Sequence, residues 1–262
     1  MRFKASTWVV VATLLLLAGC VTETTGGFNA KKSNADAAED YLKLAAGYLE
    51  QNDLATTKRH LANVARLDAD NSEMHAIWGL VYAREGEPRL AERSFQQSLR
   101  KNPGNSKARN NYAAFLFANA RYADAYQQLS KVVEDTQYES RPQAFENLGL
   151  AALRINRNKE AEEAFTRALQ LNPNQARSTL ELTALNLAKP DAKQAQASYR
   201  RFQTLQQLYN LPHSARSLWL GVQLELALGN KEAARNYGKQ LQSSFATAPE
   251  ALLYKQVADN IK

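Results

Sequence analysis

The feature that most constrains this chain is a two-residue motif that recurs about every 34 residues. At Ala91 and Phe95 a small residue is followed four positions later by a large apolar one, and the pairing returns after successive steps of 34, 36, 34 and 38 residues. The later pairs are Ala125 with Leu129, Ala161 with Phe165, Ala195 with Tyr199 and Ala233 with Tyr237, and one step backwards gives Thr57 with Leu61. A nearly constant period of this length is typical of stacked helical units. The sequence therefore predicts an all-α solenoid, which grows by adding units rather than by enclosing one centre.

The unit from Ser72 to Asn105 resembles a tetratricopeptide repeat through Trp78, Gly79, Tyr82, Ala91, Phe95 and Pro103. The resemblance implies two antiparallel helices per unit and a right-handed superhelical solenoid of about six tetratricopeptide repeats with a C-terminal capping helix. Gly79 and Ala91 are predicted to let the paired helices approach closely, while Phe95 fills the space around them. In the first repeat we expect Leu44 on the inward stripe, and in the cap we expect Leu252, Leu253 and Val257 to face inward.

The N-terminus has the pattern of a lipoprotein signal peptide. Arg2 and Lys4 precede an uncharged run from Trp8 to Leu17, which is about half of the roughly 20 residues that a membrane-spanning helix needs. The run ends in Leu-Ala-Gly-Cys, which resembles a bacterial lipobox with its cysteine at Cys20. The sequence thus predicts a signal peptide over residues 1–19 and lipidation of Cys20. The alternative is a free cysteine after an ordinary signal peptide; an internal disulfide is excluded because Cys20 is the only cysteine.

Composition divides the rest of the chain into a tether and a folded domain. Residues 20–36 are polar and predict a flexible tether, and residues 37–262 form the predicted solenoid. Val21 follows the cysteine instead of Asp, which by resemblance to Gram-negative sorting signals implies the outer membrane. The formal net charge of +7 includes Arg2 and Lys4, so the mature chain would carry +5. This excess is compatible with acidic partners or lipid headgroups, and equally with an ordinary solvated surface; nucleic acid is not an expected partner of an exported protein.

No arrangement of residues predicts catalysis, so we expect a binding protein and no enzyme. The three histidines, His60, His75 and His213, have no metal-ligand spacing to Cys, Asp or Glu, and no phosphate loop or nucleophile elbow occurs. The carboxylates around Glu160, Glu162 and Glu163 are typical of a salt-bridged helix face. We therefore expect no cofactor, no metal and no small-molecule substrate.

In tetratricopeptide arrays the first helices line a concave groove that takes peptides or helices. Carried over residue by residue, the groove positions here are Leu80, Arg84, Lys107, Asn110, Asn111, Ala114, Phe117, Glu146, Leu150 and Leu153, with Leu180 added by the fifth repeat. Lys107, Asn110 and Asn111 resemble half of a clamp for a carboxylate, although Asn111 is also compatible with an ordinary interhelical hydrogen bond. Phe117, Leu150 and Leu153 either form an exposed apolar patch or are buried by a neighbouring repeat.

The lipobox, the tether and the six repeats together resemble the PilF/PilW family of type IV pilus biogenesis lipoproteins, and the stretch Asn-Asn-Tyr-Ala-Ala-Phe-Leu-Phe from Asn110 to Phe117 resembles that family's third repeat. The resemblance implies a pilotin, held at the outer membrane by acylated Cys20 and facing the periplasm. Its implied partner is the outer-membrane secretin of the type IV pilus, whose localisation and multimerisation it promotes. The alternative is a lipoprotein scaffold that regulates cell-wall enzymes in the periplasm, and neighbouring pilus or murein genes would discriminate between the two.

Overall fold

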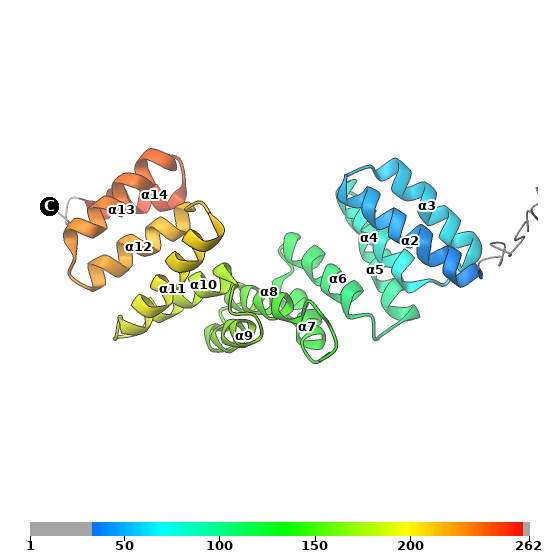
Figure 1. The fold of residues 1–262 in the computed structure, drawn as a ribbon, viewed down its shortest axis with the longest axis horizontal. Coiled ribbons are helices and arrows are strands. Elements are labelled where there is room, and N and C mark those ends of the chain that lie inside the picture. The colour runs from blue at the N-terminus through cyan, green and yellow to red at the C-terminus, as the bar shows by residue number, and fades with distance from the viewer. Residues whose placement is uncertain (1–32, 259–262) are drawn as a thin grey trace, which may run out of the picture.

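The computed structural model describes residues 33–258, and within that range the chain is built from helices and short turns. The helices carry the labels of Figure 1. Their bounds are α2 Asn34–Glu50, α3 Leu54–Leu67, α4 Ser72–Arg84, α5 Pro88–Lys101, α6 Ser106–Ala118, α7 Tyr122–Val132, α8 Arg141–Arg154, α9 Asn158–Leu171, α10 Ala176–Leu187, α11 Lys193–Tyr209, α12 Ala215–Ala227, α13 Lys231–Ser244 and α14 Pro249–Ala258.

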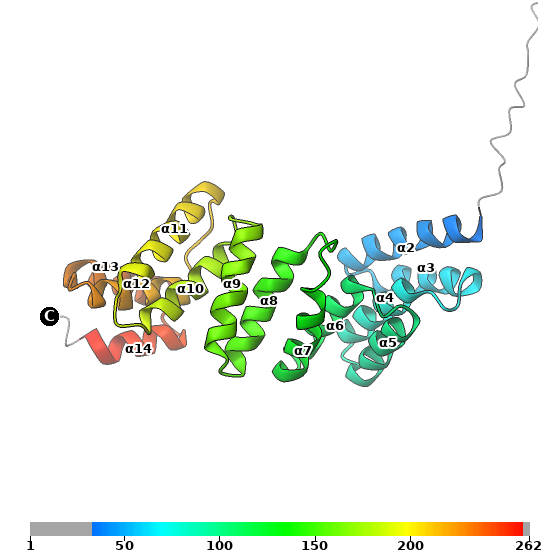
Figure 2. The same ribbon diagram turned by 90° about the horizontal axis from the view of Figure 1, so that it is seen from below.

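The helices pack as successive antiparallel pairs, from α2 with α3 to α12 with α13, and α14 covers both helices of the last pair. The described range therefore contains six repeats and one capping helix, as predicted. The repeats stack into an arch (Figure 1), and Figure 2 shows the same row of helix pairs from below. First helices of successive repeats touch one another, for example α4 with α6 and α6 with α8. The inner side of the arch is consequently a surface of first helices.

The array begins earlier than the predicted boundary at residue 37. Ser33 caps α2 by accepting a hydrogen bond from the Asp36 amide, at 3.0 Å, and the Asp36 carboxylate accepts one from the Ser33 amide. This reciprocal capping box satisfies two amides that helix formation leaves unpaired, so the helix starts at Asn34, inside the predicted tether. The signal peptide, Cys20 and the rest of the predicted tether lie outside the described residues. Between residues 33 and 258, no helix is long and apolar enough to cross a membrane.

The turn inside five of the six repeats is set by one residue with a left-handed backbone, which in repeat six is Gly229, with a φ of 80°. Asn52, Gly86, Ala120 and Asn156 have φ values of 60°, 75°, 59° and 59° at equivalent positions. Asparagine and glycine accept this conformation readily, whereas an alanine pays about 1–2 kcal/mol for it. In repeat five the equivalent position is Pro190, whose ring fixes φ near −65°. The connection from 188 to 192 is therefore built differently from the other turns.

The predicted contact between a small residue on the first helix and a large one on the second is confirmed. A Cβ atom added to Gly79 would lie 2.7 Å from the Phe95 ring, and one added to Gly149 would lie 2.6 Å from the Phe165 ring. Ala91 is fully buried beside this contact. The helix pairs can approach this closely only because the first helix carries no side chain at that point.

Two predictions of inward-facing leucines are wrong. Leu44 is 45% exposed in α2, where Ala45 and Leu49 face the core instead, and in α14 Leu252 and Leu253 are 53% and 44% exposed. The reason in α14 is a notch at Gly238 of α13, which receives the Tyr254 ring so closely that an added Cβ would lie 1.9 Å from it. Tyr254 and Ala251 therefore set the rotation of the capping helix, Val257 is partly buried, and the two leucines turn outward.

Candidate protein-binding groove

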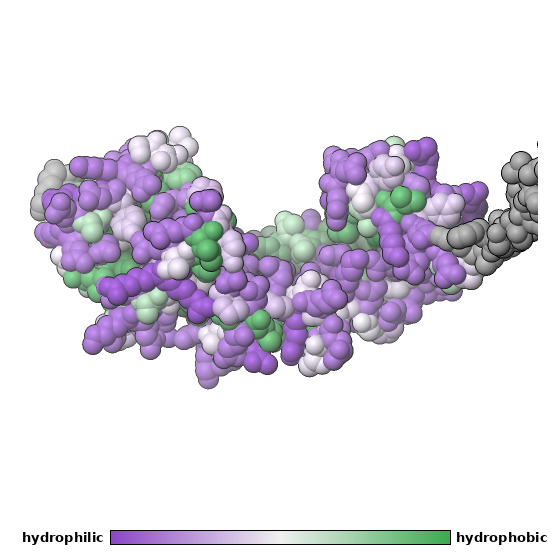
Figure 3. Space-filling view, viewed as in Figure 1, coloured by the Kyte–Doolittle hydropathy of each residue, from purple (hydrophilic) through white to green (hydrophobic). Residues whose placement is uncertain are grey.

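The inner side of the arch holds two adjoining cavities, which we call together the central groove. The first, of about 130 Å³, lies between α6, α8 and α10, and the second, of about 440 Å³, extends to α12. Phe117, Leu150 and Arg177 line both cavities. Figure 3 shows apolar surface in the hollow between the two ends of the arch. The groove thus runs across the first helices of repeats three to six.

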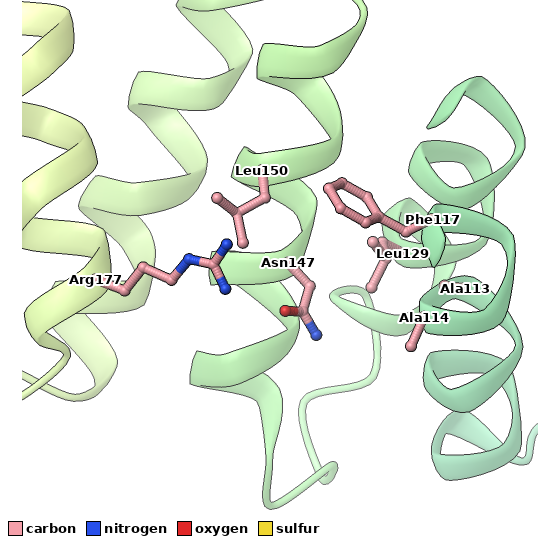
Figure 4. A pocket seen from close by; sticks show the side chains of 7 residues that line it. All are labelled: Ala113, Ala114, Phe117, Leu129, Asn147, Leu150 and Arg177. Atoms are coloured by element: carbon pink, nitrogen blue, oxygen red, sulfur yellow. The ribbon is translucent and has the colours of Figure 1, made fainter. Parts of the chain in front are cut away.

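The floor of the central groove is apolar. The Phe117 ring extends from α6 toward α8, where Leu150 lines the same cavities (Figure 4), and Leu153 follows one helical turn after Leu150. All three side chains are partly buried, while Ala114 is exposed beside them. The Tyr122 ring meets the Phe117 ring edge-on, with centroids 5.0 Å apart. The four residues predicted from the repeat pattern therefore lie together on an open surface, and their role in binding stays a prediction.

Three arginines surround this floor. The Arg154 guanidinium lies over the rings of Tyr122, at 5.3 Å, and Phe117, at 6.0 Å. Arg216 donates two hydrogen bonds to the Glu181 carboxylate, at 3.0 and 2.5 Å. Arg177 extends from α10 toward Leu150 and Asn147 (Figure 4) and makes no hydrogen bond or ion pair with any residue in the range 33–258. Of the three arginines that line the groove, Arg177 thus has neither an ion-pair partner nor an aromatic partner among residues 33–258.

Glu146 was predicted to face the groove, and the prediction is wrong. Its side chain is 6% exposed, and one carboxylate oxygen accepts hydrogen bonds from the Ser178 amide at 3.0 Å and the Ser178 hydroxyl at 2.7 Å. The Gln143 amide donates to the other oxygen at 3.0 Å. Gln175, the residue before α10, makes no side-chain cap, so Glu146 of α8 caps α10 in its place. The carboxylate joins repeat four to repeat five and is not available to a partner.

Leu180 is likewise misplaced by the sequence pattern. It is 7% exposed and packs in the core with Tyr199, Phe202 and Leu220. Repeat five lacks the usual large and small pair on its first helix, and Leu180 supplies apolar volume to the second helix instead. It is therefore a core residue.

The residues predicted to bind a carboxylate, Lys107 and Asn110, are already paired with other residues of the chain. The Lys107 ammonium pairs with Glu73 at 2.6 Å, and the Asn110 side-chain oxygen accepts a hydrogen bond from the Asn147 amide at 3.5 Å. The interhelical bond expected of Asn111 is thus made by Asn110, while Asn111 is partly buried. A carboxylate reaching this point would compete with Glu73 for Lys107.

Leu80 and Arg84 lie toward the N-terminal end of the arch, apart from the residues that line the central groove. Leu80 packs between the cores of the first repeats. Arg84 donates a hydrogen bond to the Leu49 carbonyl in the last turn of α2. Arg84 is accordingly explained by helix termination, because the last carbonyls of a helix lack intrahelical partners.

The histidines show no arrangement for chemistry. His60 stacks on Tyr48 with centroids 5.4 Å apart, and burial lowers the pKa of both His75 and His213. Among residues 33–258, no group of His, Asp or Glu side chains could hold a metal ion. Glu162, considered above as part of a carboxylate cluster, pairs with Lys189 at 2.7 Å. These side chains are engaged in packing and surface ion pairs.

Arg177 is a groove residue that was not predicted, although the repeat pattern contains the signal for it. Arg177 occupies the same position in repeat five as Lys107 does in repeat three, two repeat lengths earlier. The degenerate first helix of repeat five concealed this equivalence. Extending the mapping that selected Lys107 would have found it.

The paired helices and the uncovered inner surface define a tetratricopeptide-repeat protein, and two tetratricopeptide-repeat profiles match residues 82–147 and 142–175. The chain is 32% identical over 241 residues to the type IV pilus assembly protein PilF of Pseudomonas aeruginosa, which is 92% of each chain. It therefore belongs to the PilF/PilW-type family of tetratricopeptide-repeat proteins.

Solved structures agree with this assignment. A structure of Pseudomonas aeruginosa PilF superposes with a TM-score of 0.79 at 31% identity, covering 86% of this chain and 99% of that one. The structure of PilW, described as a widely conserved type IV pilus biogenesis factor, has a TM-score of 0.68 at 24% identity and covers 82% of this chain and 97% of that one. At that identity the second likeness supports the fold.

Proposed function

We propose that this chain acts in type IV pilus biogenesis as an outer-membrane lipoprotein that binds secretin subunits in the central groove. It would promote their localisation to the outer membrane and their multimerisation there. The observation that carries the proposal is an apolar groove left open along four successive first helices, in a relative of a pilus assembly protein. The lipobox ending at Cys20 supports the choice of compartment.

The proposed mechanism needs two functions of one chain. Acylated Cys20 would hold the protein at the membrane, and the central groove would hold a secretin segment. Tethering converts encounters between subunits into events at high effective concentration, so the pair would favour assembly without any catalytic group. Phe117, Leu150 and Leu153 would supply the apolar contact, since burying one such side chain fully is worth about 1.5–3 kcal/mol.

The direct test compares secretin assembly in cells that have or lack this protein. We expect the deletion to reduce sodium dodecyl sulfate-resistant secretin multimers and to abolish twitching motility. Cys20→Ser should mislocalise the protein and give a similar loss of multimers. Unchanged multimers and unchanged motility in the deletion strain would rule the proposal out.

A matched pair of variants separates the groove from the rest of the surface. Leu150→Ser removes apolar surface from the groove floor, while Leu171→Ser makes the same change on α9, where Leu171 is 38% exposed outside the groove. We expect fewer secretin multimers with the first variant and a normal level with the second. Equal levels in both strains would place binding on another surface.

A further inference from the structure

We infer that the central groove selects a partner segment in which an acidic side chain is flanked by apolar side chains, and that Arg177 receives the carboxylate. The inference rests on the proposed function for the identity of the partner, but not for its chemistry. The ligand is an Asp or Glu inside the segment.

Arg177 is a cation at the start of a helix and has no anionic partner of its own among residues 33–258. Arg177 lies in the first turn of α10, a turn that contains no acidic residue. The start of a helix carries a partial positive charge, so a cation there is destabilising by about 0.3–1 kcal/mol at an exposed site. Arg177 is exposed and makes no hydrogen bond or ion pair with residues 33–258. The Glu146 carboxylate already caps this helix end, so a bound carboxylate would compensate the Arg177 guanidinium.

The rest of the groove leaves this charge uncompensated. The second cavity is lined by three arginines and one glutamate, a net charge of +2. Glu181 is taken by Arg216 through two hydrogen bonds, and Glu146 is buried against Ser178. The Arg154 guanidinium is stabilised by cation–π contacts with the rings of Phe117 and Tyr122. Charge complementarity therefore requires that the carboxylate come from the partner.

Apolar side chains on the same segment fit the surface beside Arg177. Phe117 and Leu150 line both cavities together with Arg177 (Figure 4), and Leu153 continues the apolar floor in the second cavity. An Arg–carboxylate pair at the edge of an apolar floor is shielded from water on one side, which strengthens it relative to a fully solvated pair. The juxtaposition predicts one acidic residue next to apolar ones, not an acidic run.

The geometry favours an internal acidic residue over a terminal carboxylate. The groove continues past Arg177 to Arg216 on α12, so a segment can extend on both sides of the contact. The residues that resemble a clamp for a chain terminus are engaged elsewhere, Lys107 with Glu73 and Asn110 with Asn147. A C-terminal carboxylate has no prepared site here.

The test is a selection of random peptides on the full-length protein in detergent micelles. Peptides bound by the unmodified protein should be enriched in Asp or Glu next to Leu, Ile or Phe. Arg177→Gln should lose the acidic preference, whereas Arg167→Gln, the same change on the exposed face of α9, should keep it. Enrichment without acidic residues, or equal enrichment on both variants, would overturn the inference.

A binding measurement then tests the pairing itself. With a selected peptide whose C-terminus is amidated, Arg177→Gln should raise Kd about three- to tenfold, as expected for a partly exposed ion pair. Replacing the peptide's Asp by Asn should cause the same loss of affinity. The two changes together should cause no greater loss than either change alone. Arg177→Lys should retain part of the affinity that Arg177→Gln loses. Additive losses, or binding that requires a free C-terminal carboxylate, would refute the pairing.

The inference and the proposed function can fail separately. Normal secretin multimers in the deletion strain would reject the function and leave the peptide preference standing. Secretin binding that is unchanged by Arg177→Gln, in a protein that selects no acidic peptides, would reject the inference and leave the function standing. Thermal melting controls for folding, because removal of a cation from the start of α10 should not lower Tm.

Discussion

Replacement of Glu146 by alanine should weaken the junction between repeats four and five. The change removes a buried acceptor of two hydrogen bonds from Ser178, of 3.0 and 2.7 Å. A hydrogen bond to a charged group contributes about 1.5–3 kcal/mol, and an unsatisfied buried donor costs about 1–3 kcal/mol. The Ser178 hydroxyl keeps a second partner in Gln175, at 3.2 Å, which limits the loss. We expect a decrease of about 2–4 kcal/mol in the free energy of unfolding.

Urea unfolding combined with hydrogen exchange would measure this effect. Repeat arrays open locally, so the loss of protection should concentrate in α10 and the helices that follow it, while α4 and α5 keep theirs. Glu163→Ala is the matched control, because Glu163 is an exposed carboxylate of α9, and it should change stability by less than about 0.5 kcal/mol. A similarly small change for Glu146→Ala would refute the view that this carboxylate caps α10.

Three further substitutions test the packing of the repeats. Ala120→Gly should stabilise the protein by about 0.5–1 kcal/mol in chemical unfolding, because glycine accepts the φ of 59° at no steric cost, whereas Ala123→Gly on exposed helical backbone should destabilise it; a loss with Ala120→Gly would contradict the assigned strain. Gly238→Ala should lower the free energy of unfolding by on the order of 1–3 kcal/mol and speed hydrogen exchange in α14, since the new Cβ would lie 1.9 Å from the Tyr254 ring. Its control is Gly47→Ala, which should be neutral or stabilising because no atom lies within 4 Å of the new Cβ. Equal exchange rates in α14 of both variants would contradict the role of Gly238 in seating Tyr254. Ala91→Trp should overpack the second repeat by on the order of 1–3 kcal/mol or more, and an unshifted melting curve would reject the repeat register.

The period of the repeat and its small and large pairs could be predicted from sequence because each repeat carries that information locally. Gly79 and Phe95 meet within one helical hairpin, and their counterparts Gly149 and Phe165 meet in the same way. Recurrence of this local pattern was enough to predict the helix pairs and their order, although repeat five lacks the pair on its first helix. The predictions that were wrong concern residues whose environment is set by a different helix.

Glu146 was misassigned because its partner Ser178 lies in the next repeat, on a helix without a side-chain cap of its own. The outward turn of Leu252 depends on a notch at Gly238 in a different helix. No pattern within either helix contains this information. Arg177 is a different case from Glu146 and Leu252, because the repeat spacing alone makes it equivalent to Lys107. The equivalence was missed because the first helix of repeat five departs from the repeat pattern.

The connection that contains Pro190, between α10 and α11, determines where this chain can accept an insertion. In the five other repeats the turn depends on one left-handed residue, so an inserted residue would displace it and break the hairpin; these residues are Asn52, Gly86, Ala120, Asn156 and Gly229. The connection from 188 to 192 contains no residue of that kind and is exposed over most of its length. Among the turns inside the repeats, it is the one where an insertion can be absorbed as a longer loop. The spacing between the two helices of repeat five can therefore change while the groove side of α10, with Arg177, stays in register with repeats three and four.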